Sequence, residues 1–181
     1  MERRYARGTG GAKDTIGAGV TDGMTDCAAT LWRMSTPATP PVTQASAEGS
    51  GFGLLKAVRL TRQDGADRIV FEFAGAVPGY AIAYIDLPVT SDPAGLAVQL
   101  AGSGALKISL RGASAYAVVG DAEPAYRGPN RIPGGDTTQV TELLQLGDFE
   151  RVMGWVAGVN ARTGFRVSAL DAPPRLVVDV V

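Results

Sequence analysis

The sequence predicts an all-β fold, a small β-sandwich of roughly 8–10 short strands preceded by a disordered N-terminal tail. Three observations support this fold class. Segments that alternate apolar and polar residues recur about every ten residues, turn-forming residues separate them, and no helical pattern of roughly 10–15 residues lies between them. A sandwich or barrel therefore fits the chain better than a parallel α/β sheet.

The composition is that of a folded protein without a strong charge. Hydrophobic residues make up 45% of the 181-residue chain and charged residues 19%, and the formal net charge is −1. Because no basic excess is available to neutralise phosphates, we expect no nucleic-acid partner. No run of about eighteen apolar residues is present, so we expect no transmembrane segment. The single Cys27 permits neither an internal disulfide nor a thiolate metal cluster.

Residues 1–53 are predicted to be a disordered tail and linker. Gly, Ala, Thr, Ser and Pro dominate this stretch, and such residues bury too little apolar surface to offset chain entropy. Ser35–Ser50 is similar to linkers that tether a domain to another body. The basic start is not followed by an apolar stretch of roughly 7–15 residues, so no signal peptide is predicted. Asp26 before Cys27 is a poor match to a lipoprotein cleavage site.

The domain is predicted to cover residues 54–181, and a β-hairpin opens it. Leu54–Arg62 and Arg68–Ala74 are its strands, and Asp64 and Asp67 are assigned to the turn between them, because aspartate tolerates turn conformations. One face of the second strand is predicted to be core, with Ile69, Phe71 and Phe73.

Further strands are predicted wherever a short apolar segment is bounded by Gly, Pro, Asp or Asn. They are Tyr80–Leu87, Leu96–Leu100, Ala105–Leu110, Tyr116–Val119, Thr138–Leu146, Val152–Val159, Phe165–Leu170 and Leu176–Val181. The last strand has apolar residues on both of its faces, which indicates a central strand that is covered on both sides. Asp179 within it is expected either at an edge or paired with Arg59, Arg68 or Arg166.

The segment Phe149–Gly158 fits both a strand and a helix. Phe149, Val152, Met153 and Val156 have helical spacing. Two glycines inside the segment would cost a helix about 1 kcal/mol each, so we predict a strand. Trp155, flanked by apolar residues, is predicted to lie in the core.

A series of short blocks between Arg68 and Val181 resembles the AMIN-like domain found in cell-envelope proteins and lipoproteins of actinobacteria, a relative of the module that localises peptidoglycan amidases. The blocks are Asp67–Phe73, Pro78–Tyr80, Tyr126–Pro129, Gly147–Glu150 followed by Trp155 and Gly158, and Phe165–Val167 leading to Pro173–Val180. Their order and approximate spacing agree with the family.

The resemblance implies a non-catalytic β-sandwich outside the cytoplasmic membrane that binds cell-wall glycan or positions envelope proteins. Such proteins usually begin with a signal or lipoprotein sequence, whereas this chain begins with a polar, glycine-rich stretch. We therefore expect either that Met34 is the better start or that export has been lost.

The residues themselves argue against an enzyme. The chain has no histidine, which removes Ser-His-Asp and Cys-His arrangements and the usual ligands of catalytic zinc, so we predict no catalytic residue, metal or cofactor. Asp148 and Glu150 are the nearest candidates for a glycosidase carboxylate pair, since a strand would place them on one face. That enzyme is the least favoured hypothesis, and a strand end or turn explains both residues.

The loop Tyr126–Arg131 is the predicted ligand-binding site. Tyr126 can stack on a sugar ring, while Arg127 and Arg131 can pair with a carboxylate. In the alternative interpretation, Tyr126 packs under the loop and the arginines are solvated or pair with neighbouring acids. The sequence thus predicts a wall-associated binding module, with a protein-binding scaffold that uses a sheet edge or apolar patch as the alternative.

Overall fold

The structure is a computed structural model that describes residues 42–117 and 123–181. The described residues form thirteen strands and no helix. The strands are β1 (Gln44–Ala47), β2 (Gly53–Gln63), β3 (Ala66–Gly75), β4 (Gly79–Ile85), β5 (Val89–Thr90), β6 (Ala97–Val98), β7 (Gly104–Arg111), β8 (Ala113–Ser114), β9 (Arg131–Pro133), β10 (Val140–Phe149), β11 (Val152–Val159), β12 (Phe165–Asp171) and β13 (Pro174–Val180).

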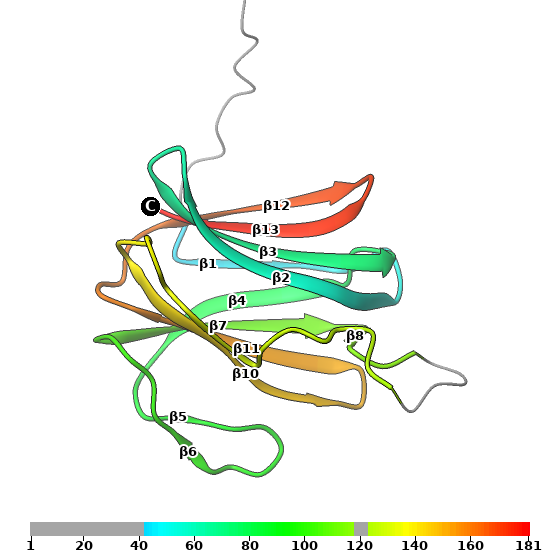
Figure 1. Ribbon diagram of the computed structural model, residues 1–181, viewed down its shortest axis with the longest axis horizontal. Coiled ribbons are helices and arrows are strands. Elements are labelled where there is room, and N and C mark those ends of the chain that lie inside the picture. The colour runs from blue at the N-terminus through cyan, green and yellow to red at the C-terminus, as the bar shows by residue number, and fades with distance from the viewer. Residues whose placement is uncertain (1–41, 118–122) are drawn as a thin grey trace, which may run out of the picture. The chain divides into compact units, whose positions relative to one another are not determined.

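The strands form two layers, as Figure 1 shows. A six-stranded sheet has the order β1-β4-β7-β11-β10-β9, and a five-stranded sheet has the order β12-β13-β3-β2-β8. Every pairing is antiparallel except that of β2 with β8. β5 and β6 form a separate two-stranded hairpin beside the larger sheet. The predicted all-β fold is confirmed, and the strand count exceeds 8–10 because four strands have only two or three residues and escape a pattern search.

The core lies between the two sheets and follows the predicted period of two. Ile69 and Phe71 of β3 are fully buried, as are Leu106, Ile108 and Leu110 of β7. The ring of Phe71 meets that of Trp155 edge-on, with centroids 5.8 Å apart. Burial of each such side chain contributes roughly 1.5–3 kcal/mol, and most of the buried apolar residues belong to this one cluster. The prediction that Trp155 is a core residue is confirmed.

The β2–β3 hairpin has the predicted turn. Asp64 and Gly65 have φ angles of 53° and 79°, the left-handed conformation that a two-residue hairpin loop requires. The register between β2 and β3 shifts between Leu55 and Ala57, which leaves Lys56 as an extra residue. This bulge explains why the apolar alternation of β2 is irregular in the sequence.

β13 is an interior strand, between β12 and β3. Asp179 on it accepts hydrogen bonds from Arg68 Nε at 2.6 Å and Nη2 at 2.9 Å. This hydrogen-bonded pairing raises the pKa of the Arg68 guanidinium above its ordinary value, against the opposing effect of burial. The prediction of an arginine partner for Asp179 is confirmed, and the partner described is Arg68.

The segment Phe149–Gly158 is extended rather than helical. β10 ends at Phe149, Glu150 and Arg151 form the turn with φ angles of 50° and 63°, and β11 follows. Gly158 explains why glycine occurs in this strand, because a Cβ there would lie 2.1 Å from the carbonyl oxygen of Ala101. The glycine lets the chain around Ala101 lie against the sheet.

Two sequence predictions are corrected by the strands observed. β1 lies within the predicted linker, pairs with β4, and follows a bridge between Val42 and Phe165. Its four residues are mostly exposed, so no apolar alternation marks it in the sequence. Tyr116 is not in a strand, because the neighbouring strand β8 ends at Ser114. The remaining predictions for 1–41 and for 118–119 lie outside the described residues.

Candidate functional site

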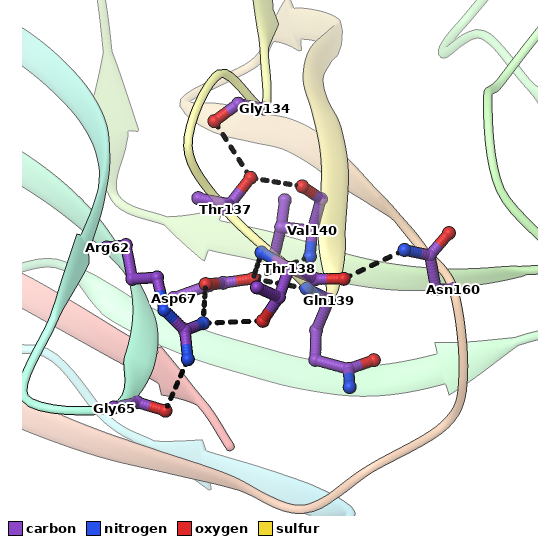
Figure 2. Close-up of polar contacts among 9 residues, drawn as sticks. All are labelled: Arg62, Gly65, Asp67, Gly134, Thr137, Thr138, Gln139, Val140 and Asn160. Carbon is purple, nitrogen blue, oxygen red and sulfur yellow. Dashed lines mark hydrogen bonds and ion pairs between the residues drawn. The ribbon is translucent and has the colours of Figure 1, made fainter.

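At one end of the sandwich, which we call the closed end, the carboxylate of Asp67 joins the two sheets (Figure 2). Asp67 lies on β3 and is fully buried. Its Oδ2 accepts hydrogen bonds from the backbone N–H groups of Thr138, Gln139 and Val140 at 2.9, 2.5 and 2.9 Å. Its Oδ1 accepts one from Arg62 Nη1 at 2.9 Å. The start of β10 is thereby fixed to the opposite sheet.

The surroundings of Asp67 also order the loop before β10. Thr137 Oγ1 lies 2.8 Å from the carbonyl oxygen of Gly134 and 2.5 Å from that of Val140. Asn160 Nδ2 donates to the Thr138 carbonyl oxygen at 2.8 Å. Figure 2 shows these contacts around the loop, with Arg62 reaching it from β2. Both oxygens of Asp67 have partners within the protein, so this carboxylate has no free oxygen for a ligand, whereas the side-chain Oε1 of Gln139 is buried without a hydrogen-bond partner among the described residues.

The closed end corrects the assignment of Asp67. Asp64 occupies the hairpin turn as predicted, but Asp67 lies on the strand and binds backbone groups of a distant loop. A buried carboxylate is stable only when hydrogen bonds replace its lost hydration, and the three N–H groups and the Arg62 guanidinium do so. Its role is therefore structural.

Arg131, one of the predicted ligand-binding residues, contacts a second buried acid. Its Nη1 donates to Oε2 of Glu142, whose side chain is 8% exposed, and its Nη2 donates to the Gln99 carbonyl oxygen at 2.9 Å. The other carboxylate oxygen of Glu142 accepts from the Ala101 N–H at 2.6 Å. The prediction that Arg131 binds a ligand is not tested by these contacts, but they match the alternative in which it pairs with a neighbouring acid.

At the other end of β10, which we call the open end, Asp148 makes a second contact between the sheets. Its Oδ2 accepts hydrogen bonds from Ser114 Oγ at 3.0 Å and from the Ala115 N–H at 2.7 Å. Ser114 belongs to β8 of the five-stranded sheet, whereas Asp148 belongs to the six-stranded sheet. Among the described residues no donor contacts Oδ1 of Asp148. One oxygen therefore holds the sandwich together and the other can accept a further hydrogen bond.

A cavity of about 600 Å³ opens beside Asp148. Its volume is in the range of pockets that hold small organic ligands. It is lined by Ala115, Tyr116, Pro124, Tyr126, Arg127, Gly128, Asn130, Gln145, Leu146, Gly147 and Asp148. Aromatic, guanidinium, amide and carboxylate groups all occur on its wall.

Tyr126 forms the apolar wall of the cavity. The residue is 6% exposed, its ring meets Trp155 edge-on with centroids 6.0 Å apart, and its hydroxyl donates to the Pro129 carbonyl oxygen at 2.8 Å. Gly128 permits this arrangement, because a Cβ there would lie 2.6 Å from the tyrosine ring. Burial raises the pKa of the Tyr126 hydroxyl above its ordinary value. Tyr126 therefore packs under its loop, as the alternative interpretation expects.

The predicted site residues are thus only partly brought together. Tyr126 and Arg127 line the cavity and Arg131 does not. Arg127 pairs with Glu123 at 2.9 Å, and both side chains are largely exposed, so the guanidinium can exchange this partner at little cost. Sequence reasoning missed Tyr116, which is 47% exposed, and Gln145, because neither belongs to a recognisable motif.

Asp148 and Glu150 do not form the carboxylate pair considered from the sequence. The prediction that a strand places both on one face is wrong, because β10 ends at Phe149 and Glu150 lies in the turn. Asp148 lines the cavity, whereas Glu150 lines a different, smaller hollow. In the parts of the chain that the structure describes, no group of three or more potential metal ligands was found, and no helix is long and apolar enough to cross a membrane.

Comparison with known proteins assigns the family. A family model described as the AMIN-like domain matches residues 53–181, which is more than half of the chain and includes every strand from β2 to β13. No curated protein and no solved structure gave a match. AMIN-like domains are non-catalytic modules associated with localisation or binding at the cell envelope. The matched range contains both carboxylate contacts and the cavity. Because the match covers more than half of the chain, the chain belongs to the AMIN-like domain family.

Proposed function

We propose that this chain is an extracytoplasmic binding module that holds a larger assembly at the cell wall and contacts wall glycan through the cavity at the open end. The observation that carries the proposal is the divided role of Asp148, which uses Oδ2 to hold Ser114 and Ala115 while it lines the cavity. A carboxylate fixed in this way is a preorganised acceptor for a sugar hydroxyl.

The other groups on the cavity wall suit the same ligand. Tyr116 presents an exposed aromatic surface on which the apolar face of a sugar ring can stack. The side chains of Asn130 and Gln145 supply amide donors and acceptors for hydroxyl groups. Arg127 can leave Glu123 to bind a carboxylate of the glycan or its peptide. A polyhydroxylated, weakly acidic ligand matches this set better than an apolar one.

Cosedimentation of the full chain with insoluble peptidoglycan tests the proposal. We expect the protein in the pellet, and we expect Asp148→Asn and Arg127→Gln together to weaken retention about tenfold by removing charge-assisted hydrogen bonds. Asp136→Asn is the matched control, because Asp136 is an exposed acid that lies outside the cavity lining. Recovery of the native protein in the supernatant at low salt would refute glycan binding.

One observation favours protein binding as a second candidate function. β12 is at the edge of the five-stranded sheet, where it pairs with β13 and carries Leu170, which is 41% exposed. On its other side, the only pairing among the described residues is the bridge of Phe165 to Val42. An edge strand can accept a strand from a partner. Concentration-dependent association in ultracentrifugation, abolished by Ala169→Pro, whose backbone N–H is on the outer side of β12 as that of Phe165 is, and accompanied by no glycan retention, would support this function instead.

A further inference from the structure

A second hollow, separate from the glycan cavity in all but Gly147, lies at the β10–β11 turn. Its volume is about 230 Å³, and its lining is Asp92, Gly147, Phe149, Glu150 and Val152. Phe149 and Val152 face each other in the register of β10 and β11, and they are 56% and 41% exposed. The hollow therefore has an exposed apolar side made of an aromatic ring and a branched side chain.

Asp92 is brought to this hollow by a close approach between its loop and β10. The Asp92 N–H donates to the Leu146 carbonyl oxygen at 3.1 Å. A Cβ on Gly147 would lie 1.9 Å from the Asp92 carbonyl oxygen, so no other residue at this position would permit the approach. Asp92 thus has a fixed backbone position beside Phe149.

Glu150 supplies a second carboxylate from the turn itself. Among the described residues, neither Asp92 nor Glu150 has a side-chain hydrogen bond or an ion pair. The adjacent cation, Arg151, lies with its guanidinium carbon 5.8 Å from the centroid of the Phe52 ring. Two uncompensated negative charges therefore flank an exposed aromatic ring, and the charge that complements them is positive.

We propose that this hollow binds the protonated amine at the end of an aliphatic chain, as in a lysine side chain or another diamino acid. The carboxylates of Asp92 and Glu150 attract the ammonium group, and the Phe149 ring adds a cation–π contact. Val152 and the Phe149 ring cover the methylene groups of such a chain. An inorganic cation has no methylene groups and would leave these two side chains exposed to water. The size of the hollow limits the occupant to one side chain. Because the two linings share only Gly147, this site does not depend on glycan binding in the larger cavity.

An NMR titration of the isotope-labelled full chain tests the site, with N-acetyl-lysine methylamide as the ligand and N-acetyl-norleucine methylamide as its uncharged analogue. We expect saturable shifts of the backbone amides of Gly147, Phe149 and Val152, with a dissociation constant on the order of 1–10 mM for the lysine compound. The norleucine compound should bind at least about tenfold more weakly, because it has no ammonium group.

Three variants assign the binding to this hollow. Asp92→Asn with Glu150→Gln should weaken lysine binding about tenfold or more, and Phe149→Leu about threefold. Asp136→Asn removes an exposed acid elsewhere and should leave binding unchanged. Asp92, Phe149 and Glu150 are exposed, so these variants should keep the native spectrum.

Equal binding of the two compounds, full affinity in the double acid variant, or no saturable shift with either compound would each overturn the proposal. Peptidoglycan retention depends on Asp148 and Arg127 in the larger cavity and is measured separately. Its failure would leave the amine site standing, and failure of the amine titration would leave the glycan proposal standing.

Discussion

At each end of β10 an aspartate carboxylate joins the two sheets, and the two ends differ in whether a carboxylate oxygen is left without a partner. At the closed end, Asp67 is fully buried and both of its oxygens accept hydrogen bonds within the protein. At the open end, Asp148 is only partly buried, uses one oxygen, and lines a cavity of about 600 Å³. The Asp67 carboxylate is therefore fully satisfied by the fold, whereas the Asp148 carboxylate has capacity for a ligand.

This difference separates stability from function along one strand. Four donors surround the Asp67 carboxylate, and they are the backbone groups of 138–140 and the Arg62 guanidinium. Removal of that negative charge weakens the three hydrogen bonds from backbone N–H groups and leaves the Arg62 guanidinium without its anionic acceptor. Two donors hold Asp148, and the cavity beside it is open to solvent, so water can replace a lost contact there. Changes at the closed end should affect folding most, and changes at the open end should affect binding most.

The largest effect is expected for Asp67→Asn. The asparagine oxygen can keep the three N–H groups, but its NH2 group then faces the Arg62 guanidinium and the buried negative charge is lost, so the free energy of unfolding should fall by about 3–5 kcal/mol. Urea unfolding followed by tryptophan fluorescence measures the change. A loss below about 1 kcal/mol would show that the Thr138–Val140 contact contributes little and would remove the distinction between the two ends.

Gly158→Ala is expected to have the next largest effect, also near the closed end. Its Cβ would lie 2.1 Å from the Ala101 carbonyl oxygen and 2.6 Å from Thr141 Oγ1, so the chain at Ala101 must move away from the sheet. We expect a loss of about 1–3 kcal/mol in the free energy of unfolding, measured by the same urea titration.

Gly154→Ala on the same strand is the matched control for Gly158→Ala. Its Cβ would meet only Leu146 Cβ at 3.5 Å, which is ordinary van der Waals contact. In the same urea titration this variant should match or exceed wild type in the free energy of unfolding, because alanine restricts the unfolded chain. Equal losses in the two variants would mean that glycine is required throughout β11 for some reason other than the approach of Ala101.

The sequence predicted what depends on local periodicity and missed what depends on distant contacts. Leu106, Ile108 and Leu110 are recognisable because burial alternates along a strand. Asp67 was assigned to a turn because local rules favour aspartate there, whereas its backbone partners lie 71 to 73 positions away along the chain.

The open end was predictable only in part, for the same reason. The motif Tyr126–Pro129 pointed to the cavity, because an aromatic residue next to a glycine and an arginine is conspicuous in a loop. Tyr116, Gln145 and Asp148 come from other parts of the chain and meet only after the sheets pack. No spacing in the sequence records that meeting, so the cavity wall could not be assembled from motifs.

Tyr126→Phe should have a smaller effect that depends on pH. At neutral pH, loss of the hydrogen bond to Pro129 should lower the free energy of unfolding by about 1 kcal/mol. Because burial raises the pKa of Tyr126 in the folded state, the folded protein holds this proton more tightly than the unfolded chain does. This contribution is complete below the ordinary pKa of 10.0 and is lost as pH rises through the folded-state value.

Urea unfolding of wild type and Tyr126→Phe across the alkaline range isolates that contribution. Other groups titrate in both proteins, so the difference between the two curves is the quantity to examine. We expect the wild type to lose its advantage as pH rises above about 10, because the phenylalanine side chain of the variant has no proton to release. A constant difference at every pH would indicate that the Tyr126 hydroxyl is not desolvated and that the cavity wall is more open than described.

Asp148→Asn should have the smallest effect on stability and a large effect on binding. The asparagine Oδ1 can still accept from Ser114 Oγ and the Ala115 N–H, so the free energy of unfolding should fall by no more than about 1 kcal/mol. Loss of the negative charge should still weaken peptidoglycan retention by a factor of about three to ten. Measured beside Asp67→Asn, the two variants should show opposite profiles, one unstable and the other stable but poorly retained. If Asp148→Asn unfolds as readily as Asp67→Asn while the folded fraction keeps full retention, the open end is a second structural contact and the ligand binds elsewhere.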